Sequence, residues 1–215
     1  MIEKRIKFWS YSCLAVFLAG LIMIKLGGGF GSAGLPLVDK LSDTDWTKGD
    51  KNSKIVMIEY SDFECPACAV YAKIIDEAMV EFGTHIVFAY RHYPLLSMHK
   101  NAMSAAYAAE AAGVQGKFWE MHDRLFTYQN SWIQQEAPEE TYNKFAKDLG
   151  LDIEKFKTDY QSSAIHKNVE LDLESAEKNK INSTPTIFIN GQQIRNPGNY
   201  EGFRTIIRDA IKSNS

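Results

Sequence analysis

The sequence has 215 residues, of which 45% are hydrophobic and 24% are charged, and its formal net charge is −3. This composition is typical of one globular domain with a full core, and it excludes a disordered chain, a collagen-like chain and a protein with many membrane spans. The slightly acidic balance offers no basic surface for nucleic acid. Three cysteines are too few for a disulfide-rich scaffold.

The N-terminus carries an apolar run from Phe8 to Ile24, preceded by the cations Lys4, Arg5 and Lys7. A run of about 17 residues is a short membrane-spanning helix, and it is slightly longer than the core of a cleaved signal peptide. Residues 1–26 are therefore predicted to be a signal anchor, with a cleaved signal peptide as the alternative. The positive-inside rule leaves the N-terminus in the cytoplasm and the rest of the chain on the extracytoplasmic side, periplasmic or extracellular.

The residues that follow the apolar run are rich in Gly, Ser and Asp. Residues 27–53 are predicted to be a linker that holds a folded domain, residues 54–215, off the membrane. Cys13 lies within the apolar run and is interpreted as a small apolar residue of that helix. The folded domain then lies in a compartment where disulfides form and persist.

Two short apolar runs, residues 55–60 and 86–90, are typical of strands buried on both faces of a sheet. Between them, apolar residues recur at helical spacing from Pro66 to about Glu81. Proline suits the first turn of a helix, because its missing N–H would have no partner there. This part of the chain therefore predicts a strand, a helix and a second strand.

A long helical region separates these strands from the end of the chain and is predicted as an insertion at about 96–180. Its first helix, 98–112, is Ala-rich and is expected to end at Gly113. Residues 186–189 and 192–194 flank Asn190-Gly191, a pair typical of hairpins, and a last helix follows. The element order predicts an α/β fold with a mixed sheet and helices on both faces.

Cys65 and Cys68 stand at the predicted junction of a strand and a helix, separated by two residues. At a helix N-terminus, free N–H groups and the helix dipole favour thiolate over thiol, so Cys65 is predicted to be the nucleophile. Cys68 lies one turn further into the helix and is predicted to be the resolving thiol. Half of a zinc site looks the same, but the sequence has no second pair and no His at finger spacing. A purely structural disulfide is the other alternative, although so small a loop restrains the unfolded chain little.

Glu59 is a carboxylate within an otherwise apolar strand. A buried acid is costly unless it is paired or used, so its predicted use is proton transfer to or from Cys68. A carboxylate at the solvent-facing end of the strand is the alternative.

Three segments together resemble the DsbA-like thiol–disulfide oxidoreductase family. They are residues 59–68 around the cysteines, residues 115–119 with Leu125-Phe126 in the helical region, and residues 183–186 before the late strand. The resemblance covers about residues 54–211. It implies a thioredoxin-like fold with an inserted helical subdomain, here preceded by the predicted N-terminal membrane helix.

The resemblance implies roles for single residues. Cys65 and Cys68 match the nucleophilic and resolving cysteines of a redox-active disulfide, and Glu59 matches the buried acid beneath them. Thr184 and Pro185 match a cis-proline loop that packs against the disulfide and pairs with the substrate backbone.

The activity that this favours is an exported enzyme that introduces disulfide bonds into other exported proteins. A reductase or isomerase of the same fold is one alternative, and a non-catalytic binding or chaperone module is another. The resemblance also implies substrate proteins with cysteines and a membrane redox partner that recycles the disulfide. No cofactor, no metal and no nucleic acid partner is predicted.

One departure from the family pattern concerns residue 67. Pro66 and Ala67 stand between the cysteines, where strongly oxidising relatives often have Pro-His. Ala67 offers the Cys65 thiolate neither a hydrogen-bond donor nor a cation, and Asp62 and Glu64 disfavour that thiolate if they face it. The sequence therefore leaves the direction of electron flow open.

Other polar and aromatic residues receive structural interpretations. His122 and Trp119 are expected in the core or at an interface. His92 and His99 are expected at the surface, with tuning of Cys65 as the alternative. A run of acids is expected to form a solvated helix face: Glu170, Asp172, Glu174 and Glu177.

Overall fold

The computed structural model describes residues 36–37 and 40–214. The predicted signal anchor, residues 1–26, lies outside the described residues. Within the described ranges, the helices are too short or too polar to span a bilayer.

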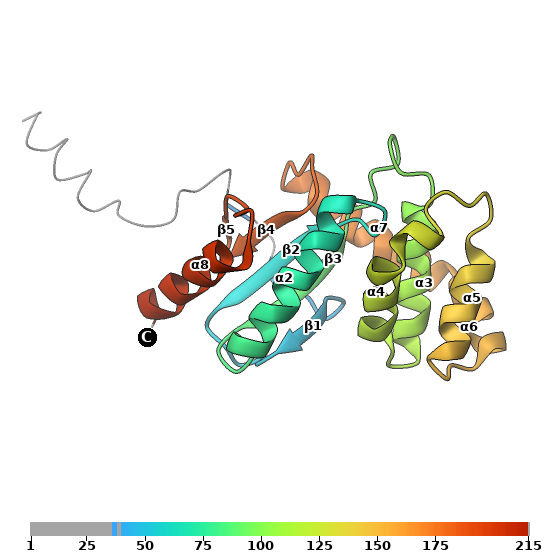
Figure 1. Ribbon diagram of the computed structural model, residues 1–215, viewed down its shortest axis with the longest axis horizontal. Coiled ribbons are helices and arrows are strands. Elements are labelled where there is room, and N and C mark those ends of the chain that lie inside the picture. Colours follow the sequence, from blue (N-terminus) through green and yellow to red (C-terminus); the bar gives the residue numbers. More distant parts are fainter. Residues whose placement is uncertain (1–35, 38–39, 215) are drawn as a thin grey trace, which may run out of the picture. The chain divides into compact units, whose positions relative to one another are not determined.

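A five-stranded sheet forms the centre of the domain, in the order β1-β3-β2-β4-β5 (Figure 1). Its strands are β1 (Trp46–Gly49), β2 (Val56–Ser61), β3 (Val87–His92), β4 (Thr186–Ile189) and β5 (Gln192–Gln193). β2 and β3 run parallel, and the other neighbouring strands pair antiparallel. The predicted mixed sheet of an α/β fold is therefore confirmed.

The two central strands owe their position to side chains that are apolar on both faces. Along β2, Met57 belongs to the larger core cluster on one face of the sheet, whereas Ile58 and Tyr60 belong to a second, smaller cluster on the opposite face. Successive side chains of a strand point to opposite faces, so Glu59 and Ser61 share the face of Met57. A sheet with two apolar faces needs cover on each of them.

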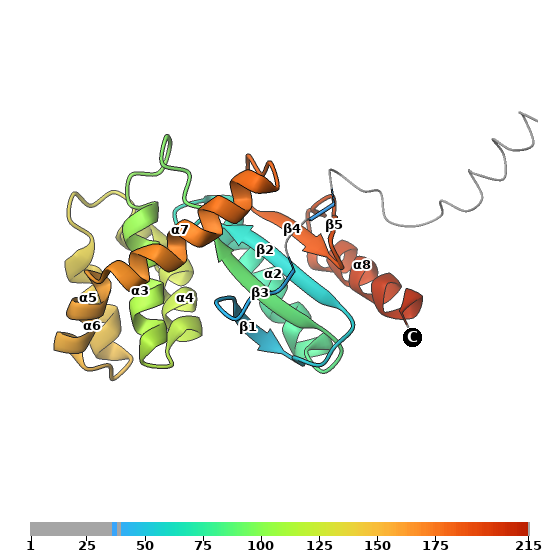
Figure 2. The ribbon, with the colours of Figure 1, turned by 180° about the vertical axis from the view of Figure 1, so that it is seen from behind.

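Helices provide that cover. On one face lie α2 (Pro66–Phe82) and α8 (Tyr200–Ser213), whose apolar stripes belong to the larger core cluster. On the other face lies α7 (Ser163–Lys178), which is on the near side in Figure 2 and contributes Ala176 to the second cluster.

Between β3 and β4 the chain forms the helical subdomain, at the place of the predicted insertion. It consists of α3 (Ala102–Val114), α4 (Phe118–Thr127), the 3₁₀ turn η1 (Gln129–Ser131), α5 (Glu139–Asp148) and α6 (Ile153–Tyr160), and it leads into α7. Asp152 caps α6 by accepting a hydrogen bond from the backbone N–H of Lys155. The predicted hairpin at Asn190-Gly191 is also present, with both residues at positive φ.

The strand β1 lies within residues 27–53, the segment predicted to be a linker, so that prediction is wrong for residues 46–49. Trp46 to Gly49 pair antiparallel with Val87 to Tyr90 of β3. The Trp46 ring stacks on Phe118 of α4 at 4.6 Å, and its Nε1 donates to Glu110 at 2.6 Å. These partners are distant in the chain, so the four-residue strand carries little local signal.

The expectation that the first helix of the insertion ends at Gly113 is wrong. The helix continues to Val114, and Gly116 supplies the residue at positive φ after it. A Cβ atom on Gly113 would overlap the ring of Trp46. The glycine is therefore required by close packing against β1 rather than by helix termination.

Candidate active site

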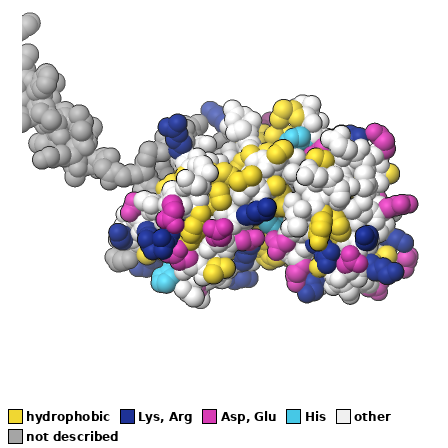
Figure 3. Space-filling view, in the orientation of Figure 1, with side chains coloured by type: hydrophobic (Ala, Val, Ile, Leu, Met, Phe, Trp, Pro, Cys, Tyr) yellow, Lys and Arg dark blue, Asp and Glu magenta, His cyan; other side chains and the backbone are white. Residues whose placement is uncertain are grey.

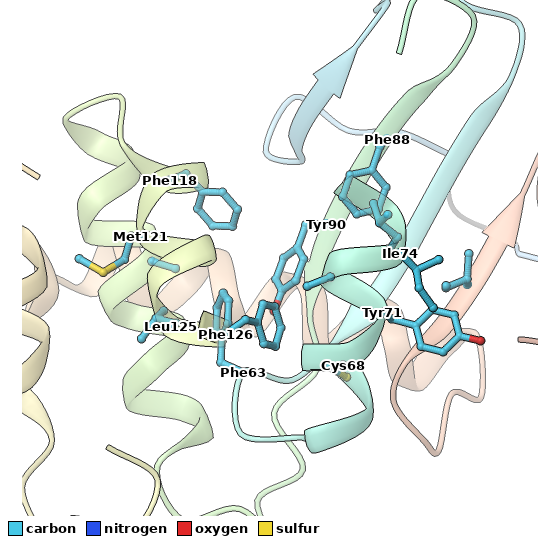
Figure 4. Packing of buried hydrophobic residues seen from close by; sticks show 14 of the residues in the cluster. Phe63, Cys68, Tyr71, Ile74, Phe88, Tyr90, Phe118, Met121, Leu125 and Phe126 are labelled. Atoms are coloured by element: carbon cyan, nitrogen blue, oxygen red, sulfur yellow. The ribbon is translucent and has the colours of Figure 1, made fainter. Parts of the chain in front are cut away.

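Cys65 and Cys68 lie where β2 passes into α2. Cys65 is the N-cap residue and has extended backbone angles. Pro66 occupies the first helical turn, as predicted. Cys65 and Cys68 are free thiols, with Cys65 7% exposed and Cys68 completely buried. Figure 4 shows Cys68 among the buried hydrophobic residues of the core. The sulfur of Cys65 is thus the one that a partner can reach.

The surroundings of Cys65 stabilise its thiolate and lower its pKa to about 5. The largest cause is a hydrogen bond from the Cys68 thiol, which outweighs the opposing effect of burial. Hydrogen bonding with Thr184 and with the backbone N–H groups of Cys68 and Ala67 lowers the pKa further. The helix N-terminus thus activates Cys65 although residue 67 is not a histidine.

Cys68 behaves in the opposite way. Burial raises its pKa well above the ordinary value, and its hydrogen bond to Cys65 and the charge of Glu59 act in the same direction. One thiol of the pair is therefore ready to react at neutral pH, whereas the other holds its proton.

The loop before β4 faces Cys65. The Thr184–Pro185 peptide bond is cis, and the carbonyl oxygen of Thr184 lies 3.7 Å from the Cys65 sulfur. Asn196 holds the loop from the other side by donating to the Pro185 carbonyl at 2.7 Å. The structure therefore brings the predicted substrate-binding pair, Thr184 and Pro185, next to the reactive cysteine.

Glu59 is 1% exposed, so the alternative of a solvent-facing carboxylate does not hold. Burial raises its pKa to about 8, while the hydrogen bond from Ser61 and the charge of Lys48 lower it. The carboxyl is therefore mostly protonated at neutral pH and can act as an acid.

Asp62 and Glu64 flank the catalytic turn, but their carboxylates bind the loop that follows β3. Asp62 accepts from the backbone N–H of Leu95 at 2.8 Å and contacts His99 Nδ1 at 2.7 Å. Glu64 accepts from the backbone N–H of Asn101 at 2.7 Å. These contacts engage both carboxylates and fasten the loop of residues 93–101 to the catalytic turn.

The structure shows the burial and the contacts of the remaining histidines and of one acid on α7. His99 is partly buried beside Asp62, and His92 is buried and contacts Glu110 at 3.0 Å, so the surface interpretation is wrong for His92. His122 is a core residue, as expected. Asp172 is not solvated like its neighbours: it accepts from the backbone N–H of His92, and burial raises its pKa to about 7.

Gln129 is a residue that sequence reasoning missed. From η1, its side-chain amide donates to the carbonyl oxygens of Phe63 at 2.8 Å and Cys65 at 3.0 Å. It therefore connects the helical subdomain to the catalytic turn. No local pattern distinguishes it, since a glutamine after a helix is ordinary and its partners lie far away in the chain.

Across residues 36–37 and 40–214, His, Cys, Asp and Glu do not gather in groups of three or more that could hold a metal ion.

Comparison with known proteins identifies a family model that matches most of the chain. Residues 41–209 match the family model described as thioredoxin. The chain is also 38% identical over 159 residues to the Na(+)/H(+) antiporter NhaA 1 of Mycolicibacterium gilvum, and 34% identical over 195 residues to the NhaA antiporter of Herminiimonas arsenicoxydans. These matches cover 72% and 88% of this chain but only 25% and 30% of the antiporters. The chain thus spans between a quarter and a third of the length of these relatives.

Solved structures share the fold. BdbD from Bacillus subtilis superposes with a TM-score of 0.71 at 23% identity, over 86% of this chain and all of that one. DsbA1 of Wolbachia pipientis gives 0.70 at 20% identity, over 82% and 95%. DsbA of Xylella fastidiosa gives 0.65 at 18% identity, over 84% and 91%. The fold implied by the sequence resemblance is therefore confirmed.

Proposed function

The chain belongs to the thioredoxin family, and on this premise we propose that it is a thiol–disulfide oxidoreductase that introduces disulfide bonds into other proteins. The observation that carries the proposal is the asymmetry of the cysteine pair. An accessible Cys65 with a lowered pKa lies at a helix tip against the Thr184-Pro185 loop, with a buried Cys68 of raised pKa behind it.

The reaction starts from the Cys65–Cys68 disulfide. A substrate thiolate attacks the Cys65 sulfur and forms a mixed disulfide, while the bond to Cys68 breaks and Cys68 keeps the electron pair. A second substrate thiolate then attacks the substrate's own sulfur in the mixed disulfide. Cys65 leaves as a thiolate, and the substrate keeps the new disulfide. The low pKa of Cys65 makes it a good leaving group for this direction.

The surroundings of the site suit an extended, partly unfolded polypeptide. Leu96 and Met98 are exposed on the loop that Asp62 and Glu64 fasten to the catalytic turn, and Val70 is exposed on α2. Apolar side chains gather along α2 on the face seen in Figure 3. In this proposal an extended substrate chain pairs like a strand with the backbone of the Thr184-Pro185 loop.

The same proposal includes a location and a partner. The cations Lys4, Arg5 and Lys7 before the apolar run 8–24 support a signal anchor, with the catalytic domain on the extracytoplasmic side. Each turnover leaves two electrons on the cysteine pair, so a partner has to remove them. A membrane redox protein would meet an anchored enzyme at the bilayer.

Substitution of one cysteine at a time tests the function. Cys68→Ser leaves the nucleophile but removes the resolving thiol, so this variant should accumulate mixed disulfides with exported proteins. Cys65→Ser leaves only the buried thiol and should accumulate almost none. Non-reducing gels with and without dithiothreitol measure the complexes, with the double variant as the control.

Equal trapping by both single variants, or trapping by Cys65→Ser alone, would show that the nucleophile is assigned wrongly. Complexes that persist after dithiothreitol, or that form equally well with the double variant, would instead favour a non-catalytic binding module.

A further inference from the structure

Ser61 is a buried hydroxyl between the buried acid and the resolving cysteine. It ends β2 two residues after Glu59, so both side chains point to the face that α2 covers. The Ser61 hydroxyl donates to Glu59 Oε1 at 3.0 Å, and Ser61 is 1% exposed. This places a proton-carrying group in direct contact with the carboxyl.

Cys68 lies in the first turn of α2, on the buried face of that helix, and belongs to the larger core cluster on this side of the sheet. Hydrogen bonding with Ser61 lowers the pKa of Cys68, while the charge of Glu59 raises it. The hydroxyl therefore has a polar neighbour on each side, the carboxyl and the thiol. Since all three side chains are at most 1% exposed, bulk water does not reach them in this conformation.

On the premise of the proposed function, we propose that Ser61 relays a proton between Glu59 and Cys68 during thiol exchange. When the disulfide opens, Cys68 leaves as a thiolate. Ser61 gives its proton to the Cys68 sulfur and takes one from the Glu59 carboxyl. The products are a Cys68 thiol, an intact Ser61 hydroxyl and a Glu59 carboxylate, so protons and charge balance. In the reductive direction the same steps run backwards.

The charges around Glu59 fit this exchange. Titratable groups on three sides of Glu59 either act on its carboxyl or are affected by its charge. They are Lys48 on β1, Cys65 at the N-cap of α2, Cys68, Tyr71 and Asp76 within α2, and Tyr90 on β3. Lys48 pairs with Asp76 at 2.7 Å, which offsets part of its charge. Desolvation remains the largest influence on Glu59 and raises its pKa to about 8. The acid is thus protonated when the disulfide opens at neutral pH.

Tyr90 provides a matched control. It pairs in register with Glu59 across β2 and β3, and its buried hydroxyl also neighbours Ser61: burial raises the pKa of Tyr90, and the Ser61 hydroxyl lowers it. Tyr90→Phe therefore removes a hydroxyl near the carboxyl without removing the bond from Ser61.

The test is reduction of the oxidised full chain by dithiothreitol from pH 6 to pH 10, with rates divided by the thiolate concentration of the reagent. The wild-type rate should fall as the pH passes about 8, where Glu59 loses its proton. Ser61→Ala should be about a hundredfold slower at pH 6, since positioned acids typically contribute about 10²–10⁴. The pH–rate profile of Ser61→Ala should show no inflection, and its rate should approach that of the wild type above pH 9. Ser61→Thr should restore the inflection, and Tyr90→Phe should keep it.

Glu59→Gln should behave like Ser61→Ala, and the double variant should be no slower than either, because the two residues act as one unit. Four results would overturn the relay: no inflection in the wild type, an inflection retained by Ser61→Ala, a loss of equal size at every pH, or additive effects in the double variant. The proposed function is tested separately with a peptide that carries two thiols. If the oxidised wild type leaves that peptide reduced, the function fails, whereas the dithiothreitol comparison still decides the relay.

Discussion

Cys65 and Cys68 are three positions apart, yet the protein shifts their pKa values in opposite directions. The cause is their position along one helix. Cys65, at the N-cap, receives a hydrogen bond from the Cys68 thiol and further ones from free backbone N–H groups, whereas burial keeps the proton on Cys68 one turn later. The departure at residue 67 therefore does not prevent activation of the nucleophile.

A histidine at position 67 should nevertheless make the pair more oxidising. In Ala67→His the ring can donate to the Cys65 thiolate and stabilise the reduced form. Each tenfold change in the equilibrium with glutathione corresponds to about 30 mV. Ala67→Leu adds bulk without a donor and serves as the control. An unchanged or lower potential in Ala67→His would contradict this argument.

Glu59 should make the stability of the protein depend on pH. Above its ordinary pKa of 4.5 the unfolded chain releases this proton, while the folded protein keeps it until about pH 8. The stabilisation of the protonated carboxyl is present below pH 4.5 and is lost as the pH rises to 8, at up to about 1.4 kcal/mol per pH unit. Urea unfolding of the wild type and of Glu59→Gln at several pH values measures this pH dependence of the free energy of unfolding.

The difference in unfolding free energy between these two proteins should move in favour of Glu59→Gln as the pH rises. Asp172→Asn is the control for a second carboxyl that titrates in this range, since burial raises the pKa of Asp172 to about 7. A difference that stays constant from pH 5 to pH 8 would show that Glu59 does not hold its proton.

At the scale of elements, the helix α3 and the strand β1 depend on each other. Trp46 packs on Gly113 and Phe118 and donates to Glu110, so one aromatic ring joins β1 to the helical subdomain. An element of four residues without a clear apolar period gains its stability from such contacts. The close approach also explains why a glycine occupies the last turn of α3.

Gly113→Ala should destabilise the protein although alanine is the better helix former. The added Cβ overlaps the Trp46 ring, and overpacking of this kind costs about 1–3 kcal/mol. Thermal and urea unfolding measure the loss. Gly198→Ala is the control, because a Cβ there meets nothing within 4 Å. A Gly113→Ala variant as stable as the wild type would mean that the ring moves aside freely.

At the scale of the domain, polar contacts connect the helical subdomain to the catalytic turn and the N-terminal segment to β3. Gln129 reaches from η1 to the carbonyl oxygens of Phe63 and Cys65. Arg91 on β3 holds Asp45 in a buried pair at 2.7 Å and donates to the Lys40 carbonyl. The geometry around Cys65 is thus set by parts of the chain far from residues 61–68.

The sequence by itself determined the regular elements and the chemistry of the cysteine pair, because both depend on near neighbours. Helical periods, the Asn190-Gly191 turn and a Cys-x-x-Cys pair at a strand–helix junction are local patterns. Only the tertiary structure decided the burial of Glu59, its contact with Ser61, the place of Gln129 and the existence of β1. Each of these depends on desolvation or on a partner that is distant in the chain, and side-chain pKa values and short strands respond to such surroundings rather than to sequence neighbours.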